Sequence, residues 1–205
     1  MFRTPIKLVA AAFLFNGAAL AQETTDTTEP ATESPTTEQV DNGLDLGQPV
    51  DETVKVGQRY DKEKFGDWSL NCLKMNAGKD LCSLLQVING PQDVPMAEFS
   101  MFRLPEGGSA VAGANILVPL ETLLQAQLTL SIDGAPAKRY NYSFCNPVGC
   151  VAQIGLTQGD IDAMKQGSKA TLTIVPAPAP DQVIELDLSL SGFTAGYDIV
   201  DVATN

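Results

Sequence analysis

Val183-Ile-Glu-Leu-Asp-Leu-Ser-Leu190 alternates between apolar and polar residues from Ile184 to its end. Successive side chains of a β-strand point to opposite faces of the sheet, so this pattern predicts a strand with one buried face. Ile184 and the three leucines would face a core, while Glu185 and Asp187 would face water. Because one half-buried strand needs partners, the segment predicts a β-sheet packed on a core.

Other segments of the chain carry β-forming residues between turn signals such as Asp133-Gly134. Glycine supplies positive φ without steric strain, so Asp133-Gly134 predicts a hairpin. A helix is predicted over residues 158–166, because Thr157 is placed to cap its start and Gly167 to end it. The fold is therefore predicted to be mainly β, an antiparallel β-sandwich of about nine strands with one short helix. The strands are expected at residues 67–74, 81–88, 96–104, 110–118, 128–132, 137–145, 150–156, 169–175 and 183–190.

The N-terminus has the pattern of a secretory signal peptide. Arg3 and Lys7 precede an apolar run over residues 8–15, and Ala19-Leu-Ala21 fits a cleavage site. The apolar run is shorter than the roughly 20 residues that a transmembrane helix needs. We therefore expect cleavage after residue 21, with no transmembrane segment afterwards.

An acidic segment rich in Thr and Pro follows the predicted signal peptide. Residues 23–38 contain no large apolar residue and cannot bury enough surface to offset the entropy lost on ordering. We predict disorder over residues 22–58 and assign a linker to 22–63, with the folded domain at 64–202. The composition favours a plain spacer over a glycosylated stalk.

The four cysteines are predicted to form disulfides. They allow three pairings, and loop-closure entropy alone does not choose among them. Proximity across predicted hairpins favours Cys72 with Cys82 and Cys145 with Cys150. Four residues separate Cys145 from Cys150, instead of the two of a thioredoxin-like site, and export favours structural disulfides over redox or zinc sites.

Composition excludes several classes of function. The chain of 205 residues has no His, which removes Ser-His-Asp and Cys-His catalysis and His-ligated zinc. Its formal charge of −12 becomes −14 once Arg3 and Lys7 are removed with the signal peptide. Nucleic acid is therefore not expected as a partner, since phosphates require Lys and Arg. No metal or other cofactor is predicted.

Several short motifs stand out in the folded part, and they are Phe65-Gly-Asp-Trp-Ser-Leu-Asn-Cys72, Cys82-Ser-Leu-Leu-Gln86, Val118-Pro-Leu120, Tyr142-Ser-Phe-Cys145 with Gly149-Cys150, and Leu188-Ser-Leu-Ser-Gly-Phe193. In combination they resemble the invasion-associated locus B family, a group of exported proteins of Gram-negative bacteria. The similarity extends over about residues 64–200, and the acidic segment lies outside it. It implies a periplasmic or envelope protein with a β-rich domain, and it supplies no catalytic residues.

Four residues of these motifs are interpreted as structural. Trp68, the single Trp, is expected to anchor the core with its indole N–H hydrogen-bonded, in preference to forming a ligand-stacking platform. Asp67 beside a glycine favours turn capping over a role as general acid in a carboxylate pair. Gly192 and Phe193 are assigned structural roles in the last motif.

The sequence thus predicts a non-enzymatic protein of the periplasm or cell envelope, or a secreted one, that acts as a binding or structural module. Its expected partner is an envelope protein or polymer. Two alternatives remain open at this point. One is a carboxylate-dependent hydrolase acting on an envelope polymer, and the other is a thiol-redox protein.

Overall fold

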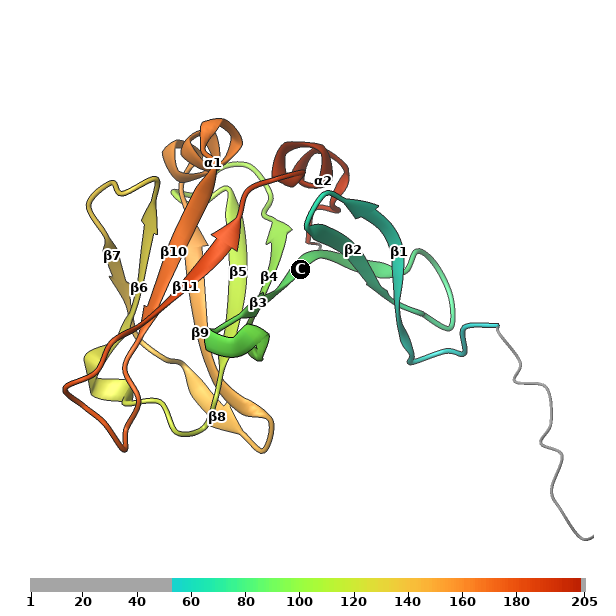
Figure 1. Ribbon diagram of the computed structural model, residues 1–205. Helices are drawn as coiled ribbons and strands as arrows, with labels where there is room; N and C mark the ends of the chain where they lie inside the picture. The colour runs from blue at the N-terminus through green and yellow to red at the C-terminus, as the bar shows by residue number, and fades with distance from the viewer. Residues whose placement is uncertain (1–52, 204–205) are drawn as a thin grey trace, which may run out of the picture. The chain divides into compact units, whose positions relative to one another are not determined.

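Two antiparallel sheets form the domain in a computed structural model that describes residues 53–203 (Figure 1). The first sheet has seven strands, in the spatial order β1 (Arg59–Phe65), β2 (Trp68–Leu73), β3 (Leu81–Asn89), β4 (Pro95–Arg103), β5 (Ala112–Val118), β9 (Gly149–Leu156) and β8 (Phe144–Asn146). The second has four strands, in the order β11 (Ile184–Ser189), β10 (Lys169–Ile174), β6 (Leu128–Ile132) and β7 (Lys138–Tyr140). The predicted antiparallel β-sandwich is confirmed.

Alternating residues of both sheets make the core. Leu186 and Leu188 on β11 are fully buried, while Glu185 and Asp187, which alternate with them, are exposed, as predicted. The inner face of the seven-stranded sheet adds larger side chains, among them Phe99, which is also fully buried. Its outer face is not covered by the second sheet and holds a mixture of polar and apolar residues.

The structure has eleven strands, so the predicted number of about nine is too low. One difference is β1, whose residues 59–63 fall within the predicted linker 22–63, so the sheet begins before the predicted end of the linker. Tyr60 and Phe65 pack partly buried against the core and hold β1 to β2, although its other residues are mostly charged. The predicted signal peptide and the rest of the linker lie outside the described residues.

The second difference is the predicted strand over residues 137–145, which is two strands. β7 pairs with β6 in the four-stranded sheet, whereas β8 pairs with β9 in the seven-stranded sheet. Residues 141–143 therefore cross from one sheet to the other, which a continuous β-forming sequence does not reveal.

Two α-helices are present where one was predicted. Helix α1 (Gln158–Gln166) has the predicted bounds, and Thr157 caps it by accepting a hydrogen bond from the Asp160 N–H. Helix α2 (Phe193–Ile199) was missed, because seven residues give too short a stretch for a clear helical period. No helix among the described residues is long and apolar enough to span a membrane.

The turn before β2 and the segment after β11 meet in what we call the junction, formed by residues 66–68 and 189–193. The Trp68 indole N–H donates to the Ser189 carbonyl over 2.9 Å, and the ring packs edge-on against Phe193. Gln86, buried on β3, donates to the same carbonyl and accepts from the Ser189 N–H. The backbone N–H and the backbone carbonyl of Ser189 are thus both hydrogen-bonded to side chains of the other sheet.

Two glycines permit this close approach. A Cβ on Gly192 would lie 2.0 Å from the Phe65 carbonyl oxygen, and one on Gly66 would lie 2.5 Å from the Ser191 oxygen. Both residues also have positive φ, a conformation that side chains disfavour. Asp67 joins the junction, since its carboxylate accepts from the Ser189 hydroxyl over 2.6 Å.

We expect Gly192→Ala to destabilise the protein much more than Gly78→Ala. Both glycines have φ near +80°, but Gly78 has open space where its Cβ would be. Gly78→Ala should therefore lose only the conformational term, about 1 kcal/mol, and Gly192→Ala about 3 kcal/mol or more. Denaturant unfolding measures both losses, and equal losses would show that the close approach at Gly192 carries no stability.

Candidate functional site

The seven-stranded sheet divides at one end, and this division, which we call the fork, creates a pocket. β3 pairs with β4 only as far as Leu84 with Met101. Beyond that point the last residue of β4, Arg103, pairs in parallel with Val202 of the C-terminal segment. The Arg103 N–H donates to the Asp201 carbonyl, and the Ala203 N–H donates to the Arg103 carbonyl. The C-terminal segment thus replaces β3 beside β4.

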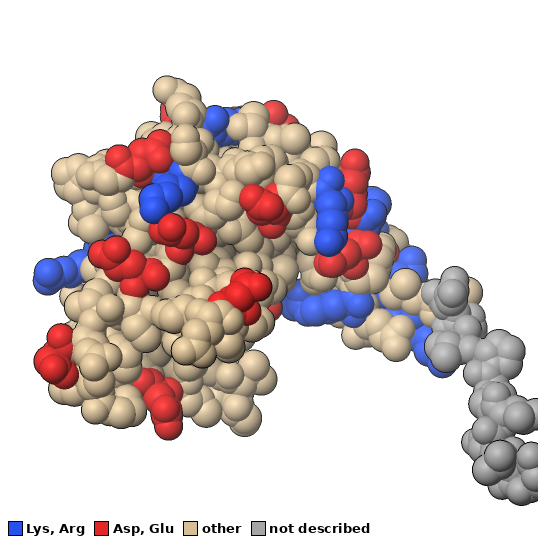
Figure 2. Space-filling model, in the orientation of Figure 1, with Lys and Arg blue, Asp and Glu red and all other residues tan. Residues whose placement is uncertain are grey.

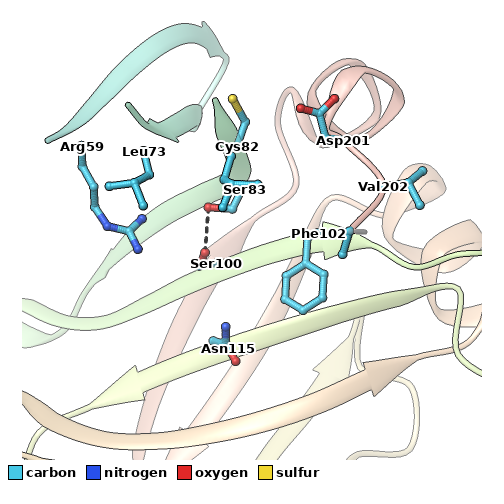
Figure 3. Close-up of a pocket in the computed structure, with 11 residues that line it drawn as sticks. Arg59, Leu73, Cys82, Ser83, Ser100, Phe102, Asn115, Asp201 and Val202 are labelled. Atoms are coloured by element: carbon cyan, nitrogen blue, oxygen red, sulfur yellow. Dashed lines mark hydrogen bonds between the residues drawn. The ribbon is translucent and has the colours of Figure 1, made fainter. Parts of the chain in front are cut away.

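The β1–β2 hairpin stays paired with β3 on the other side of the fork. Arg59 lies opposite Leu73, and Leu73 lies opposite Leu81, so these three residues form a row across the outer face. A hydrogen bond of 3.0 Å from the Ser100 hydroxyl to that of Ser83 joins β4 and β3 at the base of the fork (Figure 3).

The fork pocket has a volume of about 350 Å³ and mixed walls. The apolar side chains come from both arms of the fork and from its floor, and they are Leu73, Leu81, Phe102 and Val202. The polar ones include Arg59, Ser83, Ser100, Asn115 and Asp201 (Figure 3). This size and this combination of apolar walls with a few polar groups are typical of sites for small ligands.

A larger cleft of about 640 Å³ adjoins the fork pocket on the same face and shares Arg59, Ser100 and Asn115 with it. It extends across β5 and β9 to β8, where Phe144 is 49% and Val148 is 75% exposed. The two cavities together hollow the outer face of the seven-stranded sheet.

The disulfides that the sequence favoured are both present. Cys72 and Cys82 lie opposite each other on β2 and β3, and Cys145 and Cys150 do so on β8 and β9. Cys82 lines the fork pocket, so one disulfide holds an arm of the fork. No cysteine of the chain is free.

The other residues singled out from the sequence lie away from the two clefts. Trp68 and Phe193 are fully buried in the core, and Gly192 is in the junction. Asp67 lines a separate cavity of about 360 Å³, which contains Lys64 but no second carboxylate. The fork has no counterpart among the sequence predictions, in which Arg59 belongs to the linker. The aromatic residue next to Arg59 was the one available sign that this segment is a strand.

Two carboxylates, Asp61 and Glu98, line the larger cleft. Asp61 is on β1 and Glu98 is on β4, so three strand spacings, roughly 14 Å, separate their positions across the sheet. Glycosidase carboxyl groups lie about 5–9.5 Å apart. These two residues therefore do not form such a pair. Within residues 53–203 no cluster of acidic or sulfur ligands is placed to hold a metal ion.

Positive charge gathers around the β1–β2 hairpin, in the segments that precede and follow it. Residues 53–79 contain six Lys and Arg against three Asp and Glu, although the whole chain is acidic. Figure 2 shows this grouping on the hairpin, with Asp and Glu spread over the sandwich. At the hairpin the Tyr60 hydroxyl donates to Asp80 over 2.6 Å, and the Met75 N–H and the Lys74 ammonium also bind this carboxylate. Together they lower the pKa of Asp80 to about 2.

Residues 68–201 match the family model described as Invasion associated locus B (IalB) protein. The chain belongs to the invasion-associated locus B family. The match contains every strand of the two sheets except β1, so Arg59 lies outside it.

Similar proteins of this family occur in two bacterial genera. An invasion protein B homologue of Brucella abortus is 27% identical over 143 residues, covering 70% of this chain and 80% of that protein. Invasion protein B of Bartonella bacilliformis is 26% identical over 149 residues, covering 72% and 78%. The crystal structure of invasion associated protein b from Bartonella henselae has the same fold, with a TM-score of 0.55 and 24% identity, covering 65% of this chain and 89% of that one.

The Asp80 network predicts that acid weakens the hairpin. The folded pKa of Asp80 lies below its ordinary value of 3.8, so its stabilising effect is present above pH 4 and is lost as the pH falls towards 2. Melting temperatures of the wild type and Asp80→Asn should therefore differ at pH 6 and converge as the pH falls to about 2. A difference that stays constant across this range would contradict the prediction.

Proposed function

We propose that this protein is an exported bacterial envelope protein that binds another envelope protein or polymer through the outer face of its seven-stranded sheet, without catalysing a reaction. The observation that carries the proposal is the pair of adjoining clefts on a sheet face that the second sheet leaves uncovered. Binding sites are commonly concave, with apolar walls and a few polar groups.

The larger cleft supports a binding role through the rigid hairpin at its end. The Cys145–Cys150 disulfide joins β8 to β9, and the Asn146 side-chain oxygen accepts hydrogen bonds from the N–H groups of Val148 and Gly149. The turn therefore presents Val148 in a fixed position. Apolar residues held exposed in this way mark contact surfaces, and a partner loses little entropy on binding a surface that is already ordered.

The two catalytic alternatives have less support. The carboxylates of the larger cleft are too far apart for the glycosidase arrangement, and Asp67 has no carboxylate beside it in its cavity. All four cysteines are in disulfides within paired strands, an arrangement that favours a structural role over thiol exchange. Export is supported by the positive start, apolar run and cleavage pattern at the N-terminus.

Photo-crosslinking in intact cells tests the binding face. A photoreactive residue at Phe144 in the larger cleft should give a discrete adduct, whereas one at Glu185, exposed on the outside of β11, should not. Val148→Asp should abolish the Phe144 adduct, because it places a charge in the apolar contact. Identical adducts from both positions, or an adduct unaffected by Val148→Asp, would contradict binding at this face.

Cell fractionation tests export. Intact-mass measurement of the protein from the periplasmic or envelope fraction should give a chain that begins at Gln22. Replacing Arg3 and Lys7 with Glu should leave uncleaved protein in the cytoplasm, because the positive start directs export. Uncleaved wild-type protein in the cytoplasmic fraction would overturn this part of the proposal.

A further inference from the structure

The geometry of the fork points to a ligand class. We propose that the fork pocket binds a small aliphatic carboxylic acid, with its carboxylate on Arg59 and its apolar chain between the two arms of the fork. The inference rests on the binding role proposed above and assigns a chemistry to the smaller of the two clefts.

Arg59 supplies a cation without an anionic partner. Its guanidinium donates one hydrogen bond, of 3.2 Å, to the side-chain oxygen of Asn71, which is a neutral acceptor. Among residues 53–203, Arg59 takes part in no ion pair with Asp or Glu. A guanidinium has five N–H donors in a planar fork that matches a carboxylate. Most of its donors therefore remain available at the mouth of the pocket.

The acidic residues nearby are already engaged. Asp201, the one carboxylate that lines the fork pocket, forms an ion pair with Lys79 in the loop between β2 and β3. Asp61 accepts a hydrogen bond of 2.8 Å from the Asn71 amide and lines the larger cleft, not the fork pocket. Among the residues that line the fork pocket, Arg59 is thus the charged side chain without an ion pair, and its charge is complementary to an anion.

The remaining walls favour an apolar body behind the anionic group. Leu81 is 58% exposed and Val202 is 42% exposed, and they lie on opposite arms of the fork. The Phe102 ring lies against β5, since a Cβ on Gly113 would be 2.7 Å from its Cζ atom. The ring therefore forms a floor that an aliphatic chain covers, which removes exposed apolar surface from water.

The fork pocket has one unpaired cation and several apolar side chains, and this lining favours a ligand with a single negative charge. A phosphate dianion would bring a second negative charge beside apolar walls without a second cation to pair with it. An aliphatic ammonium ion would meet Arg59 at the mouth of the pocket and be repelled. A carboxylic acid with a medium-length chain satisfies both the charge and the walls.

Nuclear magnetic resonance titration of the mature chain, residues 22–205, tests the proposal with three eight-carbon probes. Sodium octanoate should shift the amide signals of Leu73, Ser83 and Phe102 saturably. Octylammonium should bind at least about tenfold more weakly, as expected where a charge-assisted hydrogen bond is replaced by repulsion. 1-Octanol, with the same chain and no charge, should bind between the two.

Matched variants separate the charge from the apolar contact. Arg59→Gln should weaken octanoate binding about fivefold or more and leave 1-octanol unchanged, because only the carboxylate uses the guanidinium. Lys62→Gln removes one positive charge from the same strand outside the pocket and should change neither. Leu81→Ser should weaken both probes, because both lose the same apolar wall.

Three results would overturn the ligand assignment. They are equal affinities for octanoate and octylammonium, no effect of Arg59→Gln, and saturable shifts confined to the larger cleft around Phe144. The absence of saturable octanoate binding in the millimolar range also overturns it. If the Phe144 crosslink persists in that case, the binding role stands and only the ligand class fails. If octanoate binds at the fork but the Phe144 position gives no adduct in cells, the assigned ligand class stands and the proposed envelope partner is wrong.

Discussion

The packing of the two sheets against each other depends on hydrogen bonds to the backbone N–H and carbonyl of Ser189. Trp68 and Gln86 come from the first strands of the seven-stranded sheet, and Ser189 ends the last strand of the other sheet. Their side chains bind both backbone groups of Ser189, as a neighbouring strand would. Buried polar groups need such partners, and here the partners also fix the position of one sheet against the other.

The junction also positions the C-terminal segment that forms one side of the fork, because only a short stretch of chain connects the two. Gly192 turns the backbone at the junction, α2 begins at Phe193, and the chain after α2 arrives beside the end of β4. There it occupies the position that β3 has left. The arrangement of core residues around Trp68 therefore sets one wall of the fork pocket, and the Cys72–Cys82 disulfide sets the opposite arm.

Most of the strands could be predicted because the alternation of apolar and polar residues within a strand is enough to identify it. The alternation from Ile184 to Leu190 determines which face is buried, and Thr157 with Gly167 determines where α1 begins and ends. The disulfides were predicted because each closes a short connection between adjacent strands. β1 was missed because its charged residues resemble those of the acidic segment before it, although Tyr60 and Phe65 attach it to the core.

The fork was beyond prediction for a different reason. It depends on where β3 and β4 separate and on which distant segment fills the space between them. The alternation of apolar and polar residues in β3 or β4 indicates neither. Asp67 was expected to cap a turn, whereas its carboxylate accepts from the Ser189 hydroxyl, 122 residues away, so the junction could not be derived from spacing alone. Arg59, placed in the linker, was never considered beside Phe102 and Val202.

One wall of the fork pocket, the C-terminal segment, is attached to the domain by few contacts. Residues 201–203 contact β4 through a few backbone hydrogen bonds, and they contribute little to the buried core. A carboxypeptidase that trims the chain to Val200 would remove a wall of the pocket while leaving both sheets paired. Such trimming would remove the residue that pairs with Arg103 and leave the end of β4 as an unpaired sheet edge.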